Sequence, residues 1–404
     1  MGIAKADRKL MREINNMQVL QRIRAQEPIS RPQLAEQTGL GLSTIGNIVT
    51  ELLDNKLVRE VGEGDSSGGR RPGLLKINES ARYAFGVKIG AQQAWISLFD
   101  LCARQLEMVE VSFEKEDAPA VVVGLIAARV EELRKAHRLT KRSILGLGIS
   151  TSGLIDPQTG ACRYSPILGW SDVPIRAALE ELLKLDVIVE NDVNAFAYGI
   201  LLQESVAATR NMICITTGPG VGAGIILNRR LYRGSCGGAG EFGHMTIDRH
   251  GPLCTCGRRG CLEVLASDQF LMARAREMAA AGESTLLESM VDEGKLSPTT
   301  LYYAAQVGDE AVRSLYRELG ENLGCGVTDL INLFNPDKIV IGGEGAVAAK
   351  FFLDAVRDVV AKSVFPHLAD QVEIVVDDGS EDVWLQGAAM LVIERFFEVP
   401  LAAY

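Results

Sequence analysis

Four potential metal ligands are concentrated in one short stretch of the 404-residue chain. The segment 240–263 reads GEFGHMTIDRHGPLCTCGRRGCLE. It holds one histidine and three closely spaced cysteines, namely His244, Cys254, Cys256 and Cys261. Zinc favours thiolate and imidazole ligands, and one histidine with three cysteines completes a tetrahedral structural site with no open position for a catalytic water. The pattern therefore predicts one structural Zn²⁺ per chain.

Two alternatives to this ligand set remain open on the sequence alone. The cysteines could be buried thiols without a metal, but Gly257 and Gly260 favour a ligand loop, because glycines permit the sharp turns that aim three sulfurs at one centre. His250 is a competing nitrogen ligand, and it stands only four residues before the first of the three cysteines. We prefer His244 because it ends the run G-E-x-G-H.

The run G-E-x-G-H followed by C-x-C-G-x-x-G-C-x-E resembles the signature of the ROK family of sugar kinases and sugar-responsive repressors. The resemblance extends from about Arg12 to the last helix. It implies that the histidine and the three cysteines hold zinc, and that Glu241, His244 and Glu263 shape a sugar pocket. It also implies an α/β fold of the actin-like ATPase (ribonuclease H-like) type, built from two lobes.

The bulk composition excludes several classes of protein. With 47% hydrophobic and 23% charged residues, the chain can bury substantial cores. It has no run of 18 uncharged apolar residues, and its first 16 residues lack the apolar region of a secretory signal. Eight cysteines in such a chain indicate reduced thiols and metal ligands and not a disulfide framework. We expect a cytoplasmic protein with no membrane partner.

Charge is distributed unevenly along the chain. Residues 1–77 contain 12 basic and 9 acidic residues, which give a net charge of +3. Because the whole chain has a net charge of −10, the remainder carries −13. A mildly basic head on an acidic body fits a small nucleic-acid-binding module attached to a separate globular domain.

The first 55 residues carry the pattern of a helix-turn-helix. Apolar residues at helical spacing predict a helix over 13–25. Ser30 and Gln33 form a capping box that begins a second, short helix, and Gly39 ends it. A third helix begins at Ser43 or the next residue and continues to the apolar pair that ends near position 53.

Two strands predicted at 57–61 and 73–77 would add a wing to these helices. The segment between them contains S-S-G-G-R-R-P, which resembles the linker of ROK repressors, especially xylose repressors. We therefore predict a winged helix-turn-helix domain with its linker over residues 1–77. The alternative is an ordinary three-helix core with no role in DNA binding.

Short polar side chains on the third helix and two arginines in the wing are the candidate DNA contacts. They are Ser43, Thr44, Asn47, Thr50, Arg70 and Arg71. Hydroxyl and amide groups can bond phosphates and base edges in a major groove, whereas arginines on a flexible arm can enter a narrow minor groove. The alternative for the arginine segment is a solvated linker.

From Tyr83 onward strands and helices are mixed in two groups, which by periodicity alone indicates an α/β protein with two lobes. With the resemblance we expect the first lobe at 78–195, with the C-terminal helix 382–398 returning to it. The second lobe, which carries the zinc site, is expected at 196–381.

The resemblance also assigns a sugar pocket between the lobes. Its predicted residues are Ser152, Gly153, Asn191, Asp192, Glu241, His244 and Glu263. Each sugar hydroxyl needs a donor or acceptor once it is buried, which suits carboxylates and amides. Asp192 occupies the position of the catalytic base of the kinases, although a strand-end turn residue is the alternative reading. Ile167 replaces an amide common in the family, so one hydroxyl loses its partner or the ligand lacks that hydroxyl.

The first phosphate loop distinguishes a kinase from a repressor. Kinases of this fold carry D-x-G-x-T, and Lys88 stands here in the position of the aspartate. A lysine cannot ligate Mg²⁺, and the side chains of Ala91 and Gln92 obstruct close approach of phosphate. The second loop, residues 216–222, keeps its glycines. We therefore expect no catalytic residues.

The sequence thus predicts a sugar-responsive repressor of carbohydrate-metabolism genes, with a monosaccharide as effector. We expect a homodimer or a higher homo-oligomer that binds a palindromic operator, since paired recognition helices are related by a twofold axis. One alternative is an ATP-dependent sugar kinase with a fused DNA-binding domain. Another is a regulator controlled by a partner protein.

Overall fold

The computed structural model describes residues 8–63, 73–203, 206, 208–377 and 382–398. The chain forms two units. The first holds the described residues up to Gly153, the segment Gln158–Glu190 and the residues from Leu385 onward, and the second holds Leu154–Pro157 and the described part of Asn191–Trp384. No helix in the described ranges is long and apolar enough to cross a membrane.

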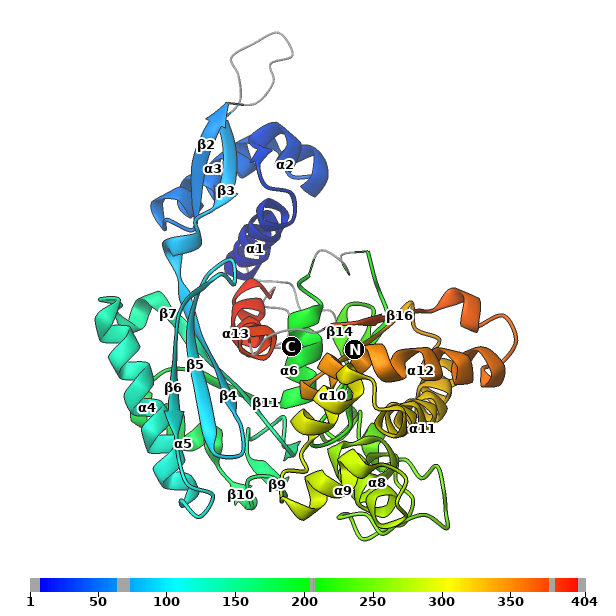
Figure 1. The fold of residues 1–404 in the computed structure, drawn as a ribbon. Helices are drawn as coiled ribbons and strands as arrows, with labels where there is room; N and C mark the ends of the chain where they lie inside the picture. The colour runs from blue at the N-terminus through cyan, green and yellow to red at the C-terminus, as the bar shows by residue number, and fades with distance from the viewer. Residues whose placement is uncertain (1–7, 64–72, 204–205, 207, 378–381, 399–404) are drawn as a thin grey trace. The chain divides into compact units, whose positions relative to one another are not determined.

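The N-terminal part of the first unit consists of three helices and a small sheet (Figure 1). Its elements are α1 (Arg8–Gln26), β1 (Ile29–Ser30), α2 (Arg31–Thr38), α3 (Leu42–Asp54), β2 (Val58–Glu63) and β3 (Gly73–Ile77). The strands are antiparallel in the order β1-β3-β2. Ser30 caps α2 through the predicted capping box with Gln33, and Gly39 follows α2 with a φ of 71°.

Helix α3 differs slightly from its prediction. It begins at Leu42, one residue before Ser43, because the extended Gly41 serves as its N-cap. Its buried face consists of Ile45, Ile48, Val49 and Leu52. The neighbouring Leu53 is only partly buried. The candidate contacts Arg70 and Arg71 lie outside the described residues.

The rest of the first unit is built on a five-stranded sheet in the order β11-β7-β4-β5-β6, and β9 and β10 pair with each other outside it. The elements are η1 (Glu79–Ala81), β4 (Tyr83–Ile89), β5 (Gln93–Asp100), β6 (Gln105–Ser112), α4 (Pro119–Ala136), η2 (Lys141–Ser143), β7 (Ile144–Thr151), β9 (Cys162–Ser165), β10 (Trp170–Val173), α5 (Ile175–Leu183) and β11 (Val187–Asn191). Strands β4 and β7 are parallel and almost wholly buried, as their apolar runs predict.

Helix α13 (Asp382–Phe397) and helix α4 cover opposite faces of this sheet (Figure 1). The approach of α13 is so close that a Cβ on Gly86 would lie 2.1 Å from the Leu385 carbonyl oxygen. A Cβ on Gly148 would lie 1.8 Å from the carbonyl oxygen of Ala388. Glycine at these two strand positions therefore lets the helix backbone rest directly on the sheet.

The second unit is built on a sheet in the order β14-β13-β12-β15-β16. Its elements are β8 (Leu154–Ile155), α6 (Asp192–Ile200), β12 (Met212–Thr216), β13 (Gly222–Leu227), β14 (Arg230–Leu231), η4 (Phe242–His244), α7 (Glu263–Ala266), α8 (Asp268–Ala280), α9 (Thr285–Asp292), α10 (Pro298–Val307), α11 (Glu310–Phe334), β15 (Lys338–Gly342), η5 (Glu344–Ala348), α12 (Ala349–Ser363), η6 (Ala369–Gln371) and β16 (Glu373–Val376).

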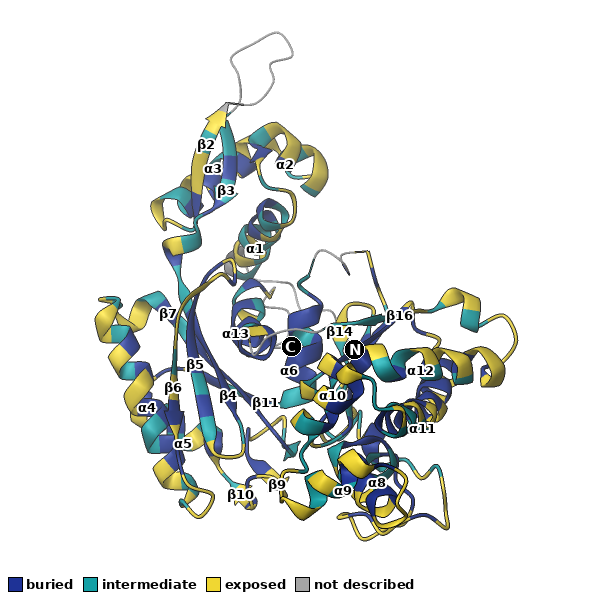
Figure 2. Cartoon of the chain, viewed as in Figure 1, coloured by how far each residue is buried: buried dark blue, intermediate teal, exposed yellow. Residues whose placement is uncertain are grey.

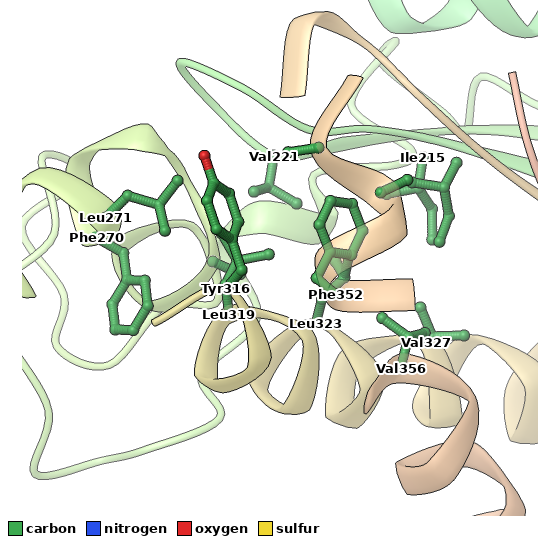
Figure 3. Packing of buried hydrophobic residues seen from close by; sticks show 14 of the residues in the cluster. Ile215, Val221, Phe270, Leu271, Tyr316, Leu319, Leu323, Val327, Phe352 and Val356 are labelled. Atoms are coloured by element: carbon green, nitrogen blue, oxygen red, sulfur yellow. The ribbon is translucent and has the colours of Figure 1, made fainter. Parts of the chain in front are cut away.

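The main core of the second unit lies where α8, α11 and α12 meet the sheet. Helix α11 supplies the longest buried stripe, which Figure 2 shows as dark blue along the helix. Figure 3 shows Tyr316, Leu319 and Leu323 from this stripe next to Phe352 of α12. A smaller core contains α6 and the first residues of α13, with the rings of Phe196 and Trp384 4.7 Å apart.

Candidate metal centre and the surrounding site

The structure brings the four predicted ligands together. One ligand atom from each of His244, Cys254, Cys256 and Cys261 lies within 4.8 Å of the others. The Cys254 sulfur is 3.7 Å from Nδ1 of His244, and the sulfurs of Cys256 and Cys261 are 3.6 Å apart. A tetrahedral zinc with bonds of about 2.0–2.3 Å requires ligand separations of about 3.6–3.8 Å, whereas a disulfide requires about 2.05 Å. The donor set therefore suits zinc, and these two separations match those of a tetrahedral site.

The local backbone explains how three sulfurs converge. Gly257 and Gly260 have φ values of 84° and 63°, as expected for the turns that redirect the loop. A Cβ on Gly260 would lie 1.4 Å from the carbonyl oxygen of Asp248, so no other residue fits there. His250, the competing ligand, is exposed and stands outside the cluster. Its backbone N–H donates instead to Oδ1 of Asp248, over 2.9 Å.

The electrostatics of the cluster favour a bound cation. The backbone and guanidinium of Arg258 lower the pKa of Cys256 to about 6. Burial, together with the two neighbouring cysteines, raises the pKa of Cys261 to about 12. Three sulfurs this close together repel one another as thiolates, and a divalent metal removes that repulsion.

His244 connects the cluster to Glu241. Its Nδ1 faces Cys254, and its Nε2 lies 4.0 Å from Oε2 of Glu241. A histidine that binds a metal through one ring nitrogen commonly directs the other toward a carboxylate, which sets the tautomer and the orientation of the ring.

Glu263 lies against the second glycine loop. It follows Cys261 by two residues and begins α7. Its Oε2 accepts a hydrogen bond from the backbone N–H of Val221 over 3.4 Å, and it lies 3.1 Å from where a Cβ on Gly220 would stand. The stretch that carries the cysteine cluster therefore also places this carboxylate at the loop.

Asn191 and Asp192 stand where β11 passes into α6. The Asn191 side chain caps the helix, since its Oδ1 accepts from the backbone N–H groups of Val193 and Asn194 at 2.9 and 3.2 Å. Asp192 lies in the first turn, where the helix dipole favours a carboxylate. The side-chain oxygen of Asn191 is thus engaged by the first turn of α6.

Strand β13 holds these groups in one region of the second unit. Helix α6 and the short helix η4 both pack against it. A Cβ on Gly224 would lie 2.7 Å from the Val193 carbonyl oxygen, and one on Gly240 would lie 1.9 Å from that of Ala223. Because Asp192 directly precedes Val193 and Glu241 directly follows Gly240, both carboxylates start from backbone that contacts the same strand.

The two remaining sugar-pocket candidates belong to the first unit. Ser152 is buried, and its hydroxyl lies 2.7 Å from that of Ser165 on β9. Gly153 has a φ of 102°, and a Cβ there would meet the carbonyl oxygen of Tyr164 at 2.2 Å. The Ser152 hydroxyl is thus held by a neighbour that spacing along the sequence does not reveal.

Lys88 is the penultimate residue of β4 and is buried, at the position that the resemblance assigns to the first phosphate loop. Its side chain is 7% exposed, and its Nζ lies 5.5 Å from the centre of the Trp95 ring. Gly90 closes a tight turn to β5, because its N–H donates to the Gln93 carbonyl over 2.8 Å. A buried ammonium thus stands where Mg²⁺ chemistry needs a carboxylate.

The four candidate DNA contacts on α3 are exposed, namely Ser43, Thr44, Asn47 and Thr50. All except Ser43 line an open groove of about 840 Å³ between α1 and α3. Arg12 and Asn15 of α1 line the same groove, and Arg12 pairs with Glu51 at 2.8 Å. Leu42 is 63% exposed at the start of α3. Sequence reasoning missed Arg12 and Asn15 because the groove depends on how the two helices pack. It also missed Leu42, which lies outside this groove.

Residues 84–395 match the ROK family over more than three quarters of the chain. The chain belongs to the ROK family. This ROK protein is 31% identical to a xylose repressor of Bacillus spizizenii over 395 residues, which cover 98% of each chain.

Solved structures of ROK proteins share the fold. A transcriptional regulator described as a homolog of the E. coli MLC protein superposes with a TM-score of 0.84 at 26% identity, covering 96% of this chain and 98% of its own. A glucokinase from Streptomyces griseus, in complex with glucose and AMPPNP, superposes with a TM-score of 0.66 at 29% identity. The glucokinase covers 76% of this chain and 98% of its own, so this ROK protein has a portion that the kinase lacks.

Proposed function

We propose that this ROK protein is a sugar-responsive transcriptional repressor of carbohydrate-metabolism genes. The proposal rests on the share of this chain that each relative matches. A xylose repressor aligns with 98% of the chain and a transcriptional regulator superposes on 96%, whereas the glucokinase superposes on 76%. The portion shared with regulators alone corresponds to a DNA-binding head.

In this proposal residues 1–77 form a winged helix-turn-helix domain, followed by two α/β lobes. Support comes from α2 and α3, whose short connection begins with Gly39 in the left-handed conformation. The hairpin of β2 and β3 then follows α3, as a wing does.

Helix α3 would enter the major groove of a palindromic operator, and the wing arginines would enter the flanking minor groove. Support for the first contact comes from the exposed polar face of α3. Leu42 would add an apolar contact, of the kind that reads a thymine methyl group. A homodimer would present two such helices related by a twofold axis.

The metal in the proposal is one structural Zn²⁺ per chain, held by the one-histidine, three-cysteine cluster. When bound, zinc would act as a tetrahedral cross-link and supply no reaction chemistry. The chain's own contribution is positional, because the same stretch sets the carboxylates of Glu241 and Glu263 toward a monosaccharide.

Lys88 supports a regulator over the alternative of an ATP-dependent sugar kinase. Phosphoryl transfer needs Mg²⁺ on the β- and γ-phosphates, and a buried ammonium cannot replace the carboxylate that holds the metal. Saturable, sugar-dependent release of ADP from ATP would overturn this part of the proposal.

The deciding experiment measures operator affinity by fluorescence anisotropy, with and without each sugar of a monosaccharide panel that includes xylose. We expect one sugar to raise the melting temperature of the free protein and to weaken operator binding by at least about tenfold, a coupling of roughly 1.4 kcal/mol. If no sugar changes either quantity, control by a partner protein replaces the sugar-responsive reading.

A further inference from the structure

A second cavity, of about 420 Å³, lies in the second unit beside the glycine loop 217–219. Its volume is within the range of small-molecule sites. Three tyrosines line it, Tyr302 and Tyr303 from α10 and Tyr316 from α11. Figure 3 shows Tyr316 rising from α11 among Leu271, Leu319 and Phe352, which also line the cavity. None of the predicted sugar-pocket residues belongs to its lining.

Two carboxylates make this cavity anionic. Asp268 begins α8 and Glu344 begins η5, and both line the cavity. Burial and the charge of Glu344 raise the pKa of Asp268 to about 6. A carboxylate at a helix N-terminus is normally stabilised by the helix dipole, so burial and the neighbouring charge outweigh that effect here.

Glu344 also occupies the approach to the glycine loop. Its Oε2 lies 3.1 Å from where a Cβ on Gly218 would stand. A phosphate group placed on the loop backbone would meet this carboxylate directly, and two like charges at such a distance repel strongly. The cavity therefore disfavours phosphate-bearing ligands.

Ser267 provides an independent indication that the cavity holds a ligand. It is the N-cap residue of α8, yet its hydroxyl makes no capping hydrogen bond. The residue is 1% exposed and lines the cavity, and its Oγ has no hydrogen-bond partner among the described residues. A buried hydroxyl without a partner costs about 1–3 kcal/mol, a cost that a bound donor or acceptor would remove.

We propose that this cavity is a second ligand site, separate from the sugar pocket, that binds a small organic ammonium with an aromatic body. The ammonium lies between Asp268 and Glu344 and donates to the Ser267 hydroxyl. The aromatic body packs on the tyrosine rings, whose faces also attract cations. Lys350 lies with its Nζ 5.4 Å from the centre of the Tyr302 ring and is not part of the lining.

The test uses calorimetry on the full-length protein, without DNA or sugar. The probes are tryptamine, its uncharged hydroxyl analogue tryptophol, and ATP. We expect saturable binding of tryptamine, binding of tryptophol at least about tenfold weaker, and no binding of ATP. Absence of tryptamine binding, equal affinity for tryptophol, or binding of ATP that tryptamine displaces would each overturn the proposal.

Variants locate the site. Asp268→Asn and Glu344→Gln should each weaken tryptamine binding by at least about tenfold, whereas Glu310→Gln, at an exposed carboxylate of α11, should not change it.

Asp268→Asn should also raise the melting temperature of the free protein at neutral pH. A carboxyl group whose pKa is raised by folding destabilises the fold once it is ionised, and the amide removes that charge. Unchanged tryptamine affinity in a folded Asp268→Asn variant would refute the site. The sugar response is measured on the same samples, so failure here is distinct from failure of the repressor function.

Discussion

At the scale of single residues, Cys256 tests the proposed metal site. It is exposed, whereas Cys254 and Cys261 are buried. We expect Cys256→Ser to reduce zinc from one per chain to near zero and to lower the melting temperature, because metal binding and local folding are coupled. Elemental analysis of the purified protein measures the metal. Cys325→Ser, at an exposed thiol of α11, is the control and should keep its zinc. A full complement of zinc in Cys256→Ser would contradict the ligand set.

A single substitution at Asp192 tests the proposed sugar pocket. Asp192→Asn should weaken the sugar response by at least about tenfold and leave operator affinity nearly unchanged, because the amide presents a donor where a hydroxyl needs an acceptor. Titration of operator release with the effector sugar measures this. Glu181→Gln, at an exposed carboxylate of α5, is the matched control. A wild-type response in Asp192→Asn would show that the pocket lies elsewhere.

At the scale of elements, the contact between α13 and its sheet depends on strand glycines. Gly148→Ala would place a Cβ 1.8 Å from the carbonyl oxygen of Ala388, so the helix must move away. We expect a loss of about 3 kcal/mol in the free energy of unfolding, measured with urea. Gly124→Ala on α4 meets nothing within 4 Å and should stabilise the protein by about 0.5–1 kcal/mol. Equal stability of the two variants would show that α13 does not rest on the sheet.

At the scale of the whole molecule, α13 is the element that joins the proposed DNA-binding head to the rest of the first unit. Arg24 of α1 pairs with Glu394 at 2.7 Å. Its guanidinium also stacks on the ring of Phe397, 4.3 Å from the ring centre. The Gln21 side chain donates to the Phe397 carbonyl. The last turn of α13 therefore contacts α1 through an ion pair, a cation–π contact and a hydrogen bond to a backbone carbonyl.

Arg24→Ala should loosen this connection and reduce the effect of sugar on operator affinity by about three- to tenfold, while sugar affinity in the free protein stays unchanged. The reason is that the sugar can act on the head only through contacts that differ between the sugar-free and the sugar-bound protein. Operator affinity with and without sugar gives the coupling. Arg22→Ala on the same helix is the control. Full coupling in Arg24→Ala would exclude α13 as the route.

The spacing of residues within short segments was enough to predict the metal cluster, one helix cap, several strands and the family. The four predicted metal ligands lie within one short segment whose glycines set the turns, so their convergence follows from the sequence alone. The capping box of Ser30 and Gln33 and the apolar strands β4 and β7 are equally local patterns, and the structure contains them. Membership of the ROK family followed from the same motifs.

Only the tertiary structure decided the contacts between distant segments. It placed His250 outside the cluster of His244 and the three cysteines, paired the Ser152 hydroxyl with Ser165, and brought Arg24 to Phe397. It also assembled the acidic, tyrosine-lined cavity from α8, α10, α11 and η5. Periodicity and capping report interactions within a few residues. Partners far apart along the chain are selected by packing of whole elements, which no short stretch of sequence encodes.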